Sequence, residues 1–181
     1  EVCINEGIVN LNTLFAPNPA GGTWSGTGVS GANFNPVTAG VAAHTLNYTI
    51  GSGTCQTSTP VTITVRPEPV ITASNDVICF GQSVVLTASG AGTGGNYAWS
   101  PATGLSCDDC DSPTANPATT TTYIITGTNT FGCSSATTAT VTVNSLPAVN
   151  AGTDTTLCNQ PIGVQFEGTI AGGTWSGASI S

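Results

Sequence analysis

One seven-residue segment occurs twice in this chain without a single change. Residues 20–26 and residues 171–177 both read Ala-Gly-Gly-Thr-Trp-Ser-Gly, and residues 94–100 form a looser copy between them. The three copies contain all three tryptophans of the chain, Trp24, Trp99 and Trp175. Self-similarity at an interval of this size is the signature of a chain built from repeated structural units. We therefore expect a tandem array of modules with one Trp at the same place in each.

The cysteines follow the same interval as the tryptophans. Cys3, Cys79 and Cys158 lie 76 and 79 residues apart, and each precedes the Trp of its module. A second cysteine, Cys55 or Cys133, follows the Trp in the first two modules. Each of these modules therefore has the order Cys, Trp, Cys.

The module ends are equally regular. Residues 60–65 and 139–143 alternate in the manner of strands, and each is followed by a short joint that contains proline, at residues 66–69 and 144–147. We predict a module that lacks its first strand over residues 1–66, a complete module over 67–146, and the front half of a third module over 147–181.

Short runs of β-branched and aromatic residues divide the complete module into candidate strands. Clusters of Gly, Pro, Asn and Asp separate these runs, and no segment has a helical period of useful length. Many short strands around a central Trp are typical of an antiparallel sandwich of two sheets. The chain is therefore predicted to be all-β, with tandem immunoglobulin-like modules arranged as beads on a rod and the Trp rings in their cores. The expected strands are residues 70–73, 83–88, 97–100, 121–126 and 139–143.

Charged side chains make up only 6% of the chain, and its one cation among Lys and Arg is Arg66. With nine Asp and Glu residues, the formal net charge is −8. Binding to a phosphate backbone or to an anionic membrane needs several cations, so we expect no nucleic-acid partner and no such docking. No apolar run approaches the roughly 20 residues that cross a bilayer, so we expect no membrane insertion and expect any targeting signal to lie outside these residues.

Seven cysteines in 181 residues indicate an oxidising, extracellular environment. The first cysteine of a module precedes its second strand and the second cysteine opens its last strand, so the two could meet at one pole of the sandwich. We therefore predict the disulfides Cys3–Cys55 and Cys79–Cys133, each of which would close one module. Cys158 is expected to stay unpaired, because its partner would fall beyond residue 181.

The segment from Cys107 to Cys110 reads Cys-Asp-Asp-Cys and has three chemical interpretations. We expect a local disulfide that closes the loop. A redox pair would need a helix N-terminus at the first thiol, and zinc would need two further ligands. Asp108, Asp109 and Asp111 could supply oxygens to a Ca²⁺ ion, or they could form a solvated acidic loop tip.

No catalytic constellation can be assembled from this composition. The chain has one His, His44, one Arg and no Lys, and its acidic residues are scattered. General acid–base or nucleophilic chemistry needs such groups gathered in one cleft. We therefore predict that the chain is not an enzyme.

Residues 97–106, 115–117, 119–123 and 129–133 resemble the PKD-like modules of giant Bacteroidetes surface proteins, and residues 151–154 with Leu157 and Cys158 resemble the opening of such a module. Such proteins are similar to type IX secretion substrates, including SprB-like gliding adhesins. The resemblance implies export to the outer-membrane exterior of a Gram-negative bacterium and an adhesive or filamentous role at the cell surface. Residues 154–156 also resemble the O-glycosylation acceptor of that phylum, which would place a sugar on Thr155.

Two functions are compatible with these features. The first is a structural repeat region of a secreted surface adhesin or filament that serves attachment or gliding. Its partners would be neighbouring modules, surface polysaccharide or other copies of the chain. The alternative is a carbohydrate-binding module array of a secreted polysaccharide-degrading enzyme, in which the Trp rings would be exposed and stack on sugars.

Overall fold

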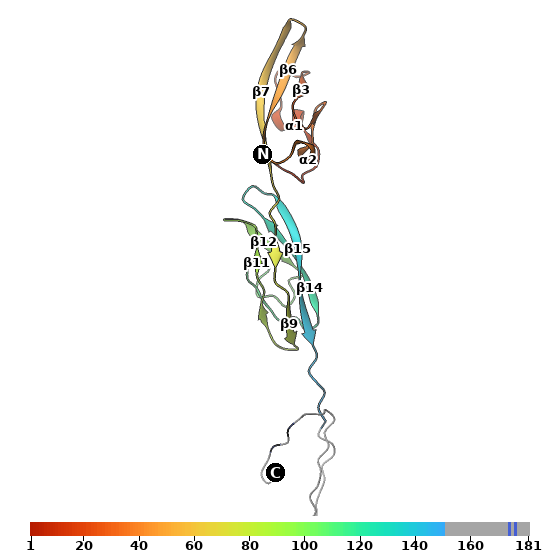
Figure 1. Ribbon diagram of the computed structural model, residues 1–181, viewed down its shortest axis with the longest axis vertical. Helices are drawn as coiled ribbons and strands as arrows, with labels where there is room; N and C mark the ends of the chain where they lie inside the picture. The colour runs from red at the N-terminus through yellow and green to blue at the C-terminus, as the bar shows by residue number, and fades with distance from the viewer. Residues whose placement is uncertain (151–173, 175, 177–181) are drawn as a thin grey trace, which may run out of the picture.

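The computed structural model describes residues 1–150, Thr174 and Ser176. Residues 1–146 form two sheet-bearing units placed end to end (Figure 1). We call residues 1–66 the first module and residues 67–146 the second module, after the predicted boundaries. Each has its own hydrophobic core, since one cluster of buried residues extends from Val2 to Val65 and the other from Ile71 to Val141.

The first module contains seven strands and two short helices. Its main sheet has the strand order β1-β7-β6-β3, and a smaller sheet has the order β2-β5-β4. Asn10 and Asn35 cap the helices, because the side-chain oxygen of each accepts hydrogen bonds from backbone N–H groups of the first turn. The elements are β1 (Val2–Cys3), β2 (Val9–Asn10), α1 (Leu11–Phe15), β3 (Thr23–Ser25), β4 (Val29–Ser30), β5 (Asn33–Phe34), α2 (Pro36–Ala39), β6 (Ala43–Ser52) and β7 (Cys55–Arg66).

The second module repeats the main sheet of the first. Its strand order is β12-β14-β15-β9, and two shorter pairs, β8 with β11 and β10 with β13, cover the other side of the core. The elements are β8 (Thr72–Ala73), β9 (Asp76–Cys79), β10 (Val84–Val85), β11 (Ala88–Ser89), β12 (Asn96–Ser100), β13 (Thr114–Ala115), β14 (Thr121–Thr128) and β15 (Ser134–Asn144).

The two main sheets share one topology. A long antiparallel hairpin, β6–β7 or β14–β15, forms the centre, and the strand that carries the Trp pairs with its first arm. The strand that carries the first cysteine pairs with the second arm in parallel, so that Cys3 lies opposite Arg66 and Cys79 lies opposite Asn144. This parallel pairing places the first cysteine beside the end of the last strand, and the local sequence pattern does not show it.

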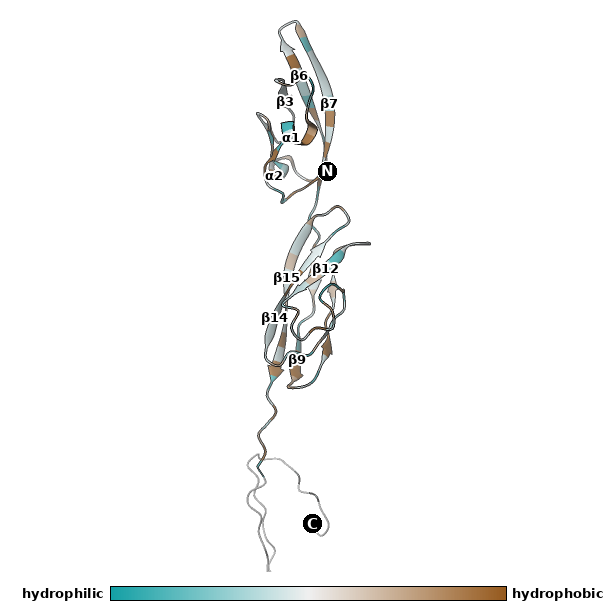
Figure 2. Ribbon diagram, turned by 180° about the vertical axis from the view of Figure 1, so that it is seen from behind, coloured by the Kyte–Doolittle hydropathy of each residue, from teal (hydrophilic) through white to brown (hydrophobic). Residues whose placement is uncertain are grey.

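Alternate residues of the hairpin strands face the cores. Tyr123, Ile125 and Gly127 of β14 are buried while the residues between them are more accessible, as expected when one face of a strand is covered. Figure 2 shows hydrophobic segments, in brown, interrupting paler ones along β7 and β15.

The tryptophans complete the cores, as the sequence predicted. Trp24 is 7% exposed and Trp99 is 3% exposed. Each indole N–H is satisfied at 2.8 Å: Trp24 donates to the side-chain oxygen of Asn12, and Trp99 donates to the carbonyl oxygen of Cys110. A buried Trp on a strand of one of two packed sheets is typical of an immunoglobulin-like sandwich, although each main sheet here also contains one parallel pair. Trp175 lies outside the described residues.

Candidate functional site

The two cysteines of each module lie at opposite ends of its last strand. In the first module, Cys55 is the first residue of β7 and Cys3 lies opposite its last residue. β7 has 12 residues, which span about 35 Å at a rise of roughly 3.3 Å per residue. β15 separates Cys133 from Cys79 in the same way over its 11 residues. A disulfide tolerates Cα separations of only about 4.4 to 6.8 Å.

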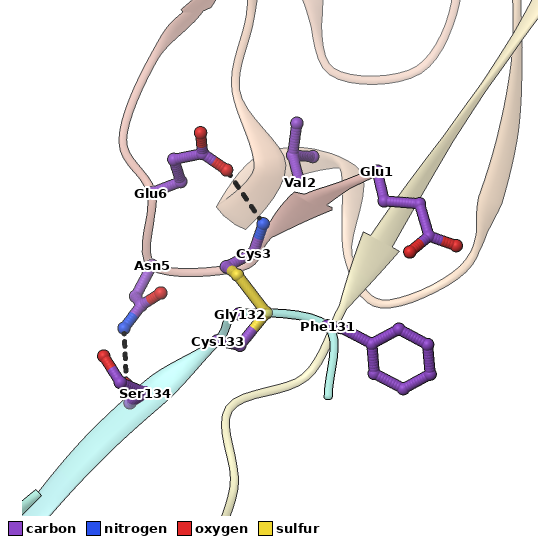
Figure 3. A pocket seen from close by; sticks show the side chains of 9 residues that line it. All are labelled: Glu1, Val2, Cys3, Asn5, Glu6, Phe131, Gly132, Cys133 and Ser134. Atoms are coloured by element: carbon purple, nitrogen blue, oxygen red, sulfur yellow. Dashed lines mark hydrogen bonds between the residues drawn. A yellow bond between two sulfur atoms is a disulfide. The ribbon is translucent and has the colours of Figure 1, made fainter. Parts of the chain in front are cut away.

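The predicted bridges Cys3–Cys55 and Cys79–Cys133 are therefore wrong. Cys3 is bonded to Cys133, across the junction between the modules, with a Cα–Cα distance of 5.5 Å (Figure 3). The prediction assumed that the first cysteine and the start of the last strand share a pole. Because β1 and β9 run parallel to the last strand, the first cysteine instead lies at the pole that faces the next module.

Hydrogen bonds to backbone carbonyls of the joint hold the second module in place beside this disulfide. The side chain of Asn129, in the β14–β15 turn, donates to the carbonyl oxygen of Pro67 at 3.4 Å, and the hydroxyl of Ser135 donates to that of Pro69. From the other side, the side-chain amide of Asn5 donates to the carbonyl oxygen of Ser134 at 3.2 Å. The turn of the second module is thus held both by the joint and by the chain that follows Cys3.

Arg66 contributes the one salt bridge found among the described residues. Its guanidinium pairs with the carboxylate of Glu1 and lies over the ring of Phe131, 4.1 Å from the ring centroid. The hydrogen bond from Arg66 is the main reason why the pKa of Glu1 is below its usual value. The ring contact is of the cation–π type, and it joins the last residue of the first module to the turn of the second.

A surface hollow of about 370 Å³ opens beside the disulfide. Figure 3 shows the side chains around it, with the Glu6 carboxylate accepting a hydrogen bond from the backbone N–H of Cys3 at 3.0 Å. Glu1, which is paired with Arg66, and Glu6 lie on its rim, and the second module contributes residues 131–134. Residues of both modules thus line this hollow, as expected at a junction between modules.

The loop around Cys107 and Cys110 is closed by a disulfide between them, with a Cα–Cα distance of 6.0 Å. Two backbone carbonyls of this loop accept hydrogen bonds from the buried Trp99 of the second module. The backbone N–H of Trp99 donates to the carbonyl oxygen of Asp108 at 2.7 Å, and its indole N–H donates to Cys110. The loop thus helps to hold Trp99 in the core, and its two sulfurs are bonded to each other.

The candidate calcium ligands Asp108, Asp109 and Asp111 are exposed. Over residues 1–150, no group of three or more His, Cys, Asp or Glu side chains is placed to hold a metal ion. The structure therefore does not bring these three carboxylates together as a ligand set.

Two cysteines remain free among the described residues, Cys55 and Cys79, and both are exposed. Sequence reasoning assigned them to bridges within modules, so their free state was missed. Cys158, predicted to be unpaired, and Thr155, predicted to carry a sugar, lie outside the described residues. In the part of the chain that the structure describes, no helix has the length and apolar character needed to span a membrane.

Comparison with known proteins finds one family model that matches the second module. Residues 68–147 match the family model of the Ig-like domain described as CHU_C associated. A comparison with curated proteins finds no match.

Several solved structures show a distant likeness to the chain. The complex of Dpr11 IG1 with DIP-gamma is 14% identical over 57% of this chain and 59% of that one, with a TM-score of 0.34. The eight N-terminal Ig domains of Down Syndrome Cell Adhesion Molecule are 14% identical over 74% of this chain and 22% of that one, with a TM-score of 0.39. The chain thus spans less than two thirds of either. The tandem Ig repeats of Dlar are 18% identical over 80% of this chain and 93% of that one, with a TM-score of 0.35. The strand arrangement and the family match together show that the second module is an immunoglobulin-like domain.

Proposed function

We propose that this chain is a structural repeat region of a secreted cell-surface adhesin or filament, and that it has no enzymatic role. The observation that carries the proposal is the junction, where the Cys3–Cys133 disulfide and hydrogen bonds to the joint fasten two sandwiches end to end. Such a junction serves to set the orientation of one module relative to the next.

The chemistry of the junction favours a stiff spacer. Two covalent links, the peptide joint and the disulfide, connect the same two poles, and two separated links restrict bending and rotation more than one. Pro67 and Pro69 stiffen the joint because each ring fixes its φ angle. A spacer of this kind would hold a terminal adhesive region away from the cell surface.

The finer parts of the proposal rest on the resemblance to Bacteroidetes surface proteins. They are display on the outer-membrane exterior, export by type IX secretion, and a role in attachment or gliding. The neighbouring modules of the same chain would be its first partners, with surface polysaccharide or other copies of the chain as further ones. The disulfides support an extracellular location, since such bonds persist in oxidising compartments.

A carbohydrate-binding array has less support from the described residues. Trp24 and Trp99, which would have to stack on sugars, are buried in the cores. The exposed ring of Phe131 lies against the Arg66 guanidinium. A glycan array probed with the oxidised chain is therefore expected to show no micromolar binding, and such binding would favour the alternative.

Small-angle X-ray scattering of the oxidised chain tests the stiff-spacer function. The double variant Cys3→Ser with Cys133→Ser removes the junction disulfide and leaves the free thiols of Cys55 and Cys79 as they are in the parent. We expect it to show a broader distribution of overall dimensions than the parent chain. The matched control, Cys107→Ser with Cys110→Ser, loses a disulfide that lies within one module and should keep the parent's distribution of dimensions. Equal breadth for the parent and the junction variant would contradict the proposal.

A further inference from the structure

The two free cysteines occupy the same places in their modules as the two bonded ones. Cys79 is the first cysteine of the second module, as Cys3 is of the first, and Cys55 is the second cysteine of the first module, as Cys133 is of the second. Each free thiol therefore corresponds to one half of the Cys3–Cys133 junction.

The backbone around Cys79 repeats the backbone around Cys3. The next residue donates to the last residue of the long strand in both modules, from Ile4 to Arg66 at 2.9 Å and from Phe80 to Asn144 at 2.8 Å. The carbonyl oxygen of the cysteine accepts from the N–H three residues later in both, at 3.1 Å for Cys3 and 2.9 Å for Cys79. The backbone around Cys79 thus has the same hydrogen bonds as the backbone that holds Cys3 against Cys133.

Cys55 lies at the tip of the hairpin that corresponds to the one carrying Cys133. It pairs with Ser52 at the end of the β6–β7 hairpin, and Cys133 closes the turn between β14 and β15. The first six residues of β7, residues 55–60, are all exposed, and Figure 1 shows this hairpin extending beyond the rest of the first module. The tip is therefore accessible to the pole of another module.

Within the described part of the chain, the pole around Cys79 also has an exposed apolar surface. Phe80 is 53% exposed and Leu146 is 61% exposed, and both line a hollow of about 460 Å³ together with Val143. The joint that leaves this pole has the length of the joint at the formed junction, because Pro147 follows Asn144 by the same interval as Pro69 follows Arg66. The pole around Cys79, its thiol and the joint that follows are therefore arranged as at the junction between the first and second modules.

We propose that Cys79 forms a disulfide with the hairpin cysteine of another module of the same kind, and that Cys55 forms one with the pole cysteine of another such module. The bridge between modules would then recur at each junction of the array. This inference rests on the proposed tandem structure, but it concerns only how successive modules are joined. In each bond two thiols lose two protons and two electrons, and a small disulfide oxidant takes them up and leaves as two thiols.

Two variants of the full chain test this pairing. One carries Cys55→Ser and Cys158→Ser and retains the Cys79 thiol, whereas the other carries Cys79→Ser and Cys158→Ser and retains the Cys55 thiol. Each is incubated alone and as an equal mixture in a glutathione redox buffer, and the products are separated without reductant and mapped by mass spectrometry.

The mixture should form Cys79–Cys55 heterodimers in roughly fivefold or greater excess over either homodimer, against about twofold for random pairing of equally reactive thiols. Random proportions, a predominance of homodimers, or monomers only would overturn the proposal. None of these results would affect the scattering test of the proposed function, because that test depends on the Cys3–Cys133 bond alone.

Discussion

At the scale of single residues, the position of each cysteine is better predicted from the sequence than its partner. The repeat correctly identified which cysteines are equivalent, because equivalence needs only aligned positions. Pairing depends on which ends of which strands meet in space. Cys3 and Cys133 lie 130 residues apart, and no local pattern reports the parallel pairing that brings the pole of one module against the turn of the next.

Arg66 provides a test of the junction through the titration of Glu1. The folded-state pKa of Glu1 is lowered by the hydrogen bond from Arg66, so its contribution to stability is present above the unfolded-state pKa and is lost as the pH falls through the folded-state pKa. In Arg66→Ala we expect the Glu1 pKa, followed by NMR, to rise toward its ordinary value. An unchanged Glu1 pKa would show that Arg66 does not lower it.

Trp99 should be the most sensitive core position of the second module. Trp99→Phe leaves the Cys110 carbonyl without its donor and reduces the volume of a buried side chain, so we expect a loss of about 2 to 3 kcal/mol in the free energy of unfolding. Ile124→Thr, on the exposed face of the neighbouring strand, should change it by less than about 0.5 kcal/mol. Similar losses in urea denaturation would contradict the assigned role of the Trp.

At the scale of strands, the alternating pattern predicted parts of the long elements of the second module. The expected runs 97–100 and 121–126 lie within β12 and β14, and 139–143 lies within β15. The run 83–88 divides instead into β10 and the start of β11, because strands this short pair with different partners. The helices α1 and α2 have five and four residues, which is too short for a helical period to show in the sequence.

Gly90, which follows β11, tests how closely the chain after β11 approaches the residues before β8. A side chain at Gly90, whose φ is +106°, would clash with the backbone carbonyl of Val70, whereas Gly92, at φ +81°, has open space around it. Gly92→Ala should cost roughly 1 kcal/mol from backbone strain alone. Gly90→Ala should cost at least about 1 kcal/mol more, because the backbone of Val70 must also move. Equal costs in urea denaturation would show that the approach is looser than described.

At the scale of the whole molecule, the near absence of cations governs association. The net charge is −8 at pH 7 and the isoelectric point is about 4.1, so mutual repulsion between chains should vanish near pH 4. We expect light scattering of the parent chain to show association at pH 4 and monodispersity at pH 7. Added salt at pH 7 serves as the control for screening of that repulsion. Monodisperse behaviour at both pH values would mean that charge does not keep the chains apart.

The path of the disulfide between the modules determines what a pulling force would meet. A force applied to the two ends of residues 1–150 enters near Cys3 and crosses directly to Cys133 through the sulfur–sulfur bond. The force then passes along β15, so that the first module and most of the second lie in a loop that carries none of it. Reduction would release this loop and lengthen the fully stretched chain by about 450 Å, for a separation of 130 residues at roughly 3.5 Å each. If a module within this loop unfolded, the disulfide would keep the distance between the two ends of the tether nearly unchanged.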